Sequence, residues 1–184
     1  MPLRKLVAGN WKMHGLSSDL EEIRAIAAAA QGYSAVDVAL CVPSILIERA
    51  ARAVPGFPIG GQDVHQAEKG AHTGCTSALM LLDAGASLTI VGHSERRDAQ
   101  REGDADVRAK AEAALSIGLN VILCIGESLD VRESGQAVGT VLNWASAGEL
   151  AAAHAAKRPA ASRVFMPTSS SACRRRAQDD RRCT

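Results

Sequence analysis

The chain has 184 residues, and its 21 Lys and Arg against 20 Asp and Glu give a formal net charge of +1. This length favours one domain with its own core, and the balanced charge excludes a surface field that would attract nucleic acid, a membrane or an acidic partner. The short apolar N-terminal stretch predicts neither a signal peptide nor a membrane span, and five unevenly spaced cysteines without a C-x-x-C motif favour the reducing cytosol over a disulfide framework or metal site.

Short apolar runs alternate with amphipathic segments from the N-terminus to about residue 127. The runs are continuous rather than alternating, which is typical of strands buried on both faces of a parallel sheet. Helical segments between them indicate an α/β fold, and the spacing favours a (β/α)8 barrel. Since eight units need about 250 residues, we expect an incomplete barrel of five βα units. The apolar runs are 6–9, 36–42, 57–62, 87–92 and 119–127.

Two of the helical segments carry end signals. Ser18 and Glu21 have the spacing of a capping box in front of the segment that begins near residue 20. A later segment, about 104–117, has Val107 and Ala111 on one face and is followed by Gly118. We expect this glycine to act as the C-cap of that helix.

Polar residues follow four of the apolar runs, in the strings "GNWK", "GQD", "GHSERR" and "CIGE". In folds with parallel strands, functional residues gather where the strands end. His93 stands at such an end with a helix start behind it, and free N–H groups there disfavour a charged imidazolium. An isolated histidine is more often structural, but this position favours a neutral imidazole that donates a hydrogen bond to a carbonyl oxygen.

Four strings in this order carry a specific likeness: "VAGNWKMH", "GAHTG", "LLDAGASLTIVGHSERR" and "LNVILCIGES". From about residue 3 to 143 the chain resembles the triosephosphate isomerase family. The resemblance implies a TIM barrel and a cytosolic homodimer of glycolysis and gluconeogenesis. It implies the interconversion of dihydroxyacetone phosphate and glyceraldehyde 3-phosphate through an enediolate, without a cofactor or metal. The expected partner is thus a small phosphorylated triose, with no nucleic acid and no membrane.

The resemblance also assigns roles to residues of the first and fourth strand ends. Lys12 would bind the substrate phosphate and offset charge on the enediolate, a role that suits a compact ammonium. Asn10 would contact the reacting end, and His93 would be the electrophile. Glu95 would pair with Lys12; alternatively, it only favours the first turn of a helix.

Two residues of "CIGE" are expected to support the site. By resemblance Cys124 and Glu127 give packing and support from behind the reacting groups, and we interpret Cys124 as a buried, inert thiol. Neither is expected to touch the substrate.

The stretch 62–77 resembles the loop through which the family forms its dimer. It begins at Gln62, and its Thr73 would reach toward Asn10 of the neighbouring subunit. Cys75 stands where the family usually carries an acidic residue, so a charged contact or cap is replaced by a thiol. The homodimer is nevertheless the expected assembly.

The C-terminal part departs from the family, so we divide the chain into a barrel part, 1–143, and a tail, 144–184. The family's base, a glutamate in "YEPVW", its glycine-rich lid and its "GGS" phosphate string do not occur, and Glu149 is the only glutamate beyond Asn143. The Ala-, Arg- and Ser-rich tail is interpreted either as a basic segment for nucleic acid or acidic partners or as the product of a reading-frame shift. We favour the shift, because no aromatic residue follows Phe165 to stack on bases.

Three hypotheses follow. The chain is a triosephosphate isomerase whose activity depends on His93. Alternatively, it is a catalytically inactive, truncated fragment that keeps affinity for phosphate through Lys12. The third is a non-catalytic interaction protein whose exposed sheet edge or intersubunit loop engages another chain.

Overall fold

The computed structural model describes residues 4–126 and 133–135, in which strands and helices alternate along the chain. Each predicted apolar run contains a strand. The strands are β1 (Lys5–Asn10), β2 (Val36–Cys41), β3 (Ile59–Gly61), β4 (Leu88–Val91) and β5 (Asn120–Leu123). The helices are η1 (Ser17–Asp19), α1 (Leu20–Ala30), α2 (Ser44–Ala53), α3 (Ala78–Asp83), α4 (Ser94–Gln100) and α5 (Asp104–Ser116).

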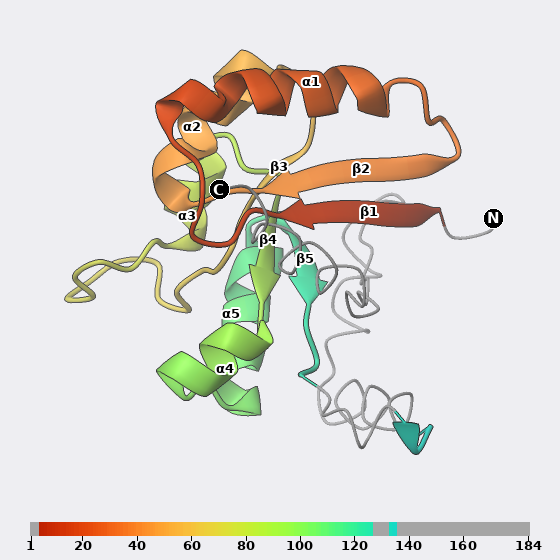
Figure 1. The fold of residues 1–184 in the computed structure, drawn as a ribbon. Helices are drawn as coiled ribbons and strands as arrows, with labels where there is room; N and C mark the ends of the chain where they lie inside the picture. Colours follow the sequence, from red (N-terminus) through yellow and green to blue (C-terminus); the bar gives the residue numbers. More distant parts are fainter. Residues whose placement is uncertain (1–3, 127–132, 136–184) are drawn as a thin grey trace, which may run out of the picture.

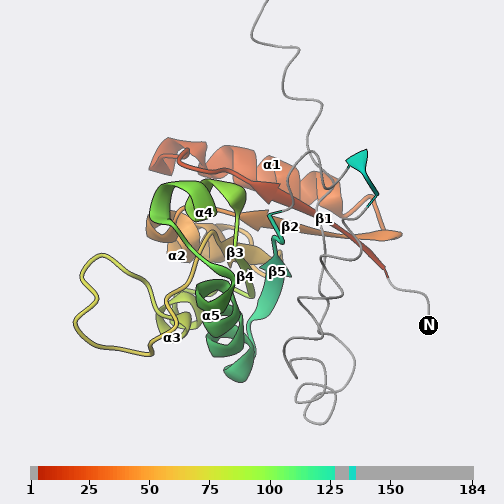
Figure 2. The same ribbon diagram turned by 90° about the horizontal axis from the view of Figure 1, so that it is seen from below.

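The strands form one parallel sheet in which spatial order follows chain order, β1-β2-β3-β4-β5. Pairing is most extensive between β1 and β2, from Lys5 opposite Val36 to Asn10 opposite Cys41. Figures 1 and 2 show the sheet curling, with the helices along its outer side. This architecture confirms the α/β prediction and corresponds to part of a TIM barrel.

Buried side chains lie on both faces of the sheet from β2 to β5, as the continuous apolar runs predict, whereas β1 has no buried residue and its Val7 is 55% exposed. Leu40 of β2 belongs to the large cluster between the sheet and the helices, together with Ile23 of α1 and Ile47 of α2. Its neighbours Ala39 and Cys41 point to the opposite, concave face and belong to a smaller cluster with residues of β4 and β5. A slip of one residue in β2 would exchange the side chains that pack in the two clusters, so this packing helps to fix the register of that strand.

The predicted capping box at Ser18 is wrong. The short 3-10 turn η1 moves the start of α1 to Leu20, so Ser18 lies within that turn instead of at the helix N-cap. The side chain of Asp19 takes over the local capping, since its Oδ2 accepts a hydrogen bond of 2.6 Å from the backbone N–H of Leu16. At the other predicted signal, Gly118 has φ +94° and follows the end of α5, as a glycine C-cap should.

Several predictions lie outside the described residues: the domain boundary near residue 143, the tail 144–184 and the side chains of Glu127 and Glu149. Within the described part of the chain, no helix has the length and apolar character needed to cross a membrane.

Candidate active site

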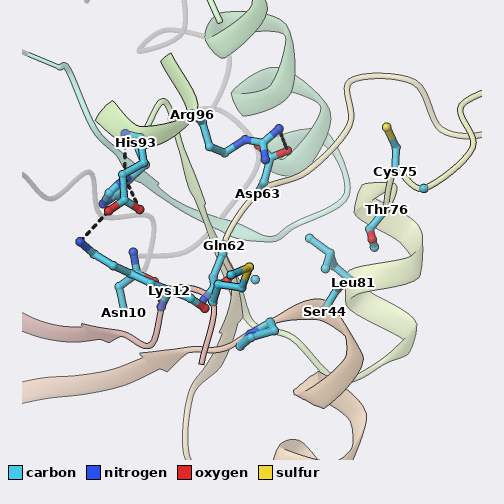
Figure 3. A pocket seen from close by; sticks show the side chains of 15 residues that line it. Asn10, Lys12, Ser44, Gln62, Asp63, Cys75, Thr76, Leu81, His93 and Arg96 are labelled. Atoms are coloured by element: carbon cyan, nitrogen blue, oxygen red, sulfur yellow. Dashed lines mark hydrogen bonds and ion pairs between the residues drawn. The ribbon is translucent and has the colours of Figure 1, made fainter. Parts of the chain in front are cut away.

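A cavity of about 360 Å³ opens at the carboxyl ends of the strands. Its volume is in the range of small-molecule sites. In Figure 3, Asn10, Lys12 and His93 lie on one side of this pocket, and Cys75 and Thr76 lie on the other. Six of the residues singled out in the sequence line it: Asn10, Lys12, Gln62, Cys75, His93 and Glu95.

The backbone of Lys12 is held in an unusual conformation. Its φ of +52° lies in the left-handed region, which costs energy for a residue with a side chain. The Lys12 N–H donates to Oδ1 of Asn10 at 2.9 Å, and the Lys12 carbonyl accepts from Nε2 of Gln62 at 2.7 Å. The Gln62 amide also lies 3.2 Å from Oδ1 of Asn10. Gln62, predicted to stand at a polar strand end and to begin the dimer loop, therefore supports the conformation of the pocket lysine.

The side chain of Lys12 forms an ion pair with Glu95. Lys12 Nζ lies 2.7 Å from Glu95 Oε1, and each side chain is about half exposed, 55% and 56%. The hydrogen bond from Lys12 lowers the pKa of Glu95, and the positive charge of Lys12 acts in the same direction. Glu95 is therefore a carboxylate near neutral pH, and it holds the ammonium group at the edge of the pocket.

His93 is the N-cap of α4, directly after the end of β4. Its Nδ1 accepts a hydrogen bond of 3.3 Å from the backbone N–H of Glu95. An accepting nitrogen carries no proton, so this contact assigns the proton of the neutral imidazole to Nε2. His93 can thus offer an N–H donor to an oxygen atom in the pocket.

The sequence analysis missed an ionic cluster that reaches from the pocket wall, at Asp63 and Arg96, to the buried side chains of Glu102 and Lys110. Lys110 of α5 is only 6% exposed, and its Nζ contacts Asp63 at 2.8 and 3.0 Å and Glu102 at 2.5 Å. Arg96 of α4 contacts the same two carboxylates at 2.9 and 2.7 Å. Burial opposes ionisation of Glu102, but the hydrogen bonds from Lys110 and Arg96 outweigh it and lower its pKa. The cluster ties the end of β3 to α4 and α5.

The predicted supporting cysteine is half-buried, not buried. Cys124 follows β5 and packs against the concave cluster, without lining the pocket. The fully buried thiol is that of Cys41, whose pKa is raised to about 12 by burial and by the nearby Cys124. The buried, inert thiol in this part of the structure is therefore Cys41 rather than Cys124.

The loop 62–77 projects from the sheet and is closed at its base. The His65 N–H donates to the Thr76 carbonyl at 2.8 Å, and the rings of His65 and His72 stack with centroids 4.0 Å apart. Thr73 is exposed in this loop and does not line the pocket of its own chain, whereas Cys75 does.

Comparison with known proteins identifies the family. The model of the family described as "Triosephosphate isomerase" matches residues 5–160. The chain belongs to the triosephosphate isomerase family. A crystal structure of triosephosphate isomerase from Bartonella henselae superimposes with a TM-score of 0.71 at 42% identity, covering 78% of this chain and 61% of that one.

Curated relatives agree with this assignment. Triosephosphate isomerases of Ruegeria sp. (strain TM1040) and Caulobacter vibrioides are 53% and 52% identical over 140 and 143 residues, covering 75% and 76% of this chain. That of Chelativorans sp. (strain BNC1) is 50% identical over 153 residues, or 80% of this chain. The chain spans about half the length of these relatives, 56–59%.

Proposed function

We propose that this protein interconverts dihydroxyacetone phosphate and glyceraldehyde 3-phosphate, as a cytosolic enzyme of the triosephosphate isomerase family. The observation that carries the proposal is that Lys12 and His93, from different strand ends, line one pocket. A cation and a neutral N–H donor are the groups needed where a phosphate dianion binds and an oxygen atom gains negative charge.

In this reaction a base removes a proton from C1 of the ketose, and the carbonyl oxygen on C2 gains negative charge. A proton then passes from the hydroxyl oxygen on C1 to the oxygen on C2, and return of a proton to C2 gives the aldose, so no atom is gained or lost overall. We assign to His93 the donation of its Nε2–H to the substrate oxygens. Lys12 offsets the enediolate charge and binds the phosphate, and Asn10 contacts the reacting end. The contacts with the oxygen atom that gains charge stabilise the transition state more than the neutral carbonyl, which is the condition for catalysis.

The proton acceptor is not among the pocket carboxylates of the described residues. Glu95 is bound to Lys12, and Asp63 is bound to both Arg96 and Lys110. The cation lowers the pKa of Glu95 and so weakens it as a base. Burial raises the pKa of Asp63, but both of its oxygen atoms are already occupied by Lys110 and Arg96. We therefore assign this role to a group outside residues 4–126 and 133–135.

A homodimer is part of the proposal. Large apolar side chains are exposed beside the pocket: Met13 is 94% exposed, Ile45 77% and Met80 57%. Met13 itself lines the pocket, and Ile45 and Met80 are direct neighbours of the lining residues Ser44 and Leu81. Such a patch is typical of a surface that another protein covers. We propose that a second copy covers it and inserts its loop 62–77, with Thr73 directed toward the site.

A coupled assay for triosephosphate isomerisation tests the proposal. The change His93→Gln removes the Nε2–H donor and should lower kcat/KM at least about tenfold, since a positioned donor is typically worth more than that. His14→Gln is the matched control, because His14 is exposed and does not line the pocket. An inactive wild-type protein, or a His93→Gln variant as active as the control, would refute the proposed function.

A further inference from the structure

The helix that begins at His93 is not positioned by the hydrophobic core. No residue of α4 is buried, so apolar packing gives this helix little orientation. Its contacts with the rest of the molecule are polar, and they come mainly from Arg96 and Arg97, the last residues of the string "GHSERR".

The two arginines extend to different parts of the fold. Arg96 joins the ionic cluster with Asp63 and Glu102. Arg97 instead donates from Nε to the carbonyl of Gly92 at 2.9 Å and from Nη2 to the carbonyl of Cys124 at 3.3 Å. These carbonyls belong to the residue just before His93 and to the residue just after β5.

Arg97 thereby continues the connection between β4 and β5 beyond their ladder. The ladder ends with Val91 opposite Leu123, followed by a hydrogen bond of 2.9 Å from the Cys124 N–H to the Val91 carbonyl. The next carbonyl on β4, that of Gly92, receives its donor from Arg97. Because a buried carbonyl needs a donor, the guanidinium fixes the direction in which the chain leaves β4.

Both loops are shaped around this side chain. Gly92 has φ +69°, and a Cβ there would lie 2.6 Å from the Cys124 carbonyl oxygen and 3.1 Å from Arg97 Nη2. Gly126 has φ +66°, and a Cβ there would lie 2.7 Å from Arg97 Cδ. The Arg97 side chain is only 16% exposed, and its Nη1 is held by Asp104 at the start of α5 at 2.7 Å. The guanidinium therefore occupies a defined site between three segments.

We propose that Arg97 is a positioning residue for His93: by holding the carbonyls of Gly92 and Cys124 together, it sets the place and orientation of the imidazole at the pocket. This inference rests on the proposed function only for its catalytic consequence. The geometric part of the inference, that the orientation and tautomer of the His93 imidazole depend on Arg97, can be tested without any activity.

The residue must be an arginine. A guanidinium presents several N–H donors in a rigid plane, so it can serve two carbonyls and a carboxylate together. A lysine ammonium keeps the charge and can reach Asp104, but it lacks the planar fork that reaches both carbonyls. Arg97→Lys is therefore the diagnostic variant, and Arg97→Gln is the second.

The test uses the full chain with ¹⁵N-labelled histidines, of which the sequence has five. His93→Gln assigns the His93 signals. In the wild-type protein we expect an unprotonated Nδ1 and a protonated Nε2 in one sharp set of signals. In Arg97→Lys and Arg97→Gln we expect this set to broaden or to show a mixture of tautomers. Arg108→Met, which removes an exposed arginine of α5 that contacts Glu112, should leave it unchanged.

The kinetic readout separates positioning from substrate binding. If the proposed function holds, Arg97→Lys lowers kcat at least about tenfold, since small displacements of a reacting group have large effects. KM should change by less than about twofold, because Lys12 is untouched. An inactive wild-type protein refutes the proposed function, and the ¹⁵N signals still decide the role of Arg97. Unchanged His93 signals in both Arg97 variants overturn the positioning role. Loss of the whole fold in both variants, measured by circular dichroism, also overturns it, because Arg97 would then be a structural residue only.

Discussion

Replacing Lys110 by methionine tests the energetics of the buried cluster. The change keeps the length of the side chain and removes its charge, leaving Glu102 and Asp63 with Arg96 as their remaining cation. Breaking a buried ion pair by removing one partner costs about 3–5 kcal/mol. Since Arg96 stays within 2.9 Å of both carboxylates, we expect the lower end, about 3 kcal/mol. For a chain of this size that corresponds to a fall in Tm of about 6–12 °C.

The assay is urea unfolding followed by tryptophan fluorescence, because Trp11 packs against the core. Arg108→Met is the matched control on the same helix: Arg108 is 43% exposed, and its pair with Glu112 is of the type worth about 0.3–0.5 kcal/mol. The double variant Lys110→Met/Glu102→Met should regain part of the loss, because it also removes the carboxylate that would be left buried. If Lys110→Met costs no more than the control, the argument from burial is wrong.

Two further predictions concern the pocket and its surroundings. Lys12→Met should return the pKa of Glu95 toward its ordinary value of about 4.3, measured by NMR titration of the carboxyl group. The lowered pKa of Glu95 stabilises the wild-type fold at pH values above the pKa of the unfolded chain, and this contribution is lost as pH falls through the lower pKa of the folded protein. Acidification should therefore destabilise the wild type more than the variant. An unshifted titration would contradict the assigned ion pair. Ile45→Asp should convert the proposed dimer into a monomer in sedimentation velocity, whereas Tyr33→Asp, at a site 66% exposed and away from the pocket, should not; equal behaviour of the two would exclude the proposed interface.

The strands were predictable because each is a continuous apolar run. The strands β2 to β5 carry buried side chains on successive residues, so their runs show no polar alternation, and the run 36–42 became β2 almost residue for residue. The helix start near Ser18 was not predictable to that accuracy. Serine and aspartate are comparable caps, and the choice of Asp19 depends on the 3-10 turn that the chain forms there.

The pocket was predictable in part, because polar residues mark the strand ends. Asn10, Lys12, Gln62 and His93 stand at the ends of apolar runs or within three residues of them, and the parallel topology brings them together. Lys110 gave no such signal, since on sequence it is one more charge on an amphipathic helix. Its burial depends on Asp63, 47 residues away, and that contact exists only once the sheet has formed.

The order of the strands has a consequence for synthesis on the ribosome. Among the strands of residues 4–126, each of β2 to β5 pairs with the one made just before it, so none of these pairings waits for a later segment of the chain. Lys12 and Glu95, 83 residues apart, meet once β1 to β4 and the beginning of α4 have emerged. This side of the pocket can therefore assemble while the rest of the chain is still being made.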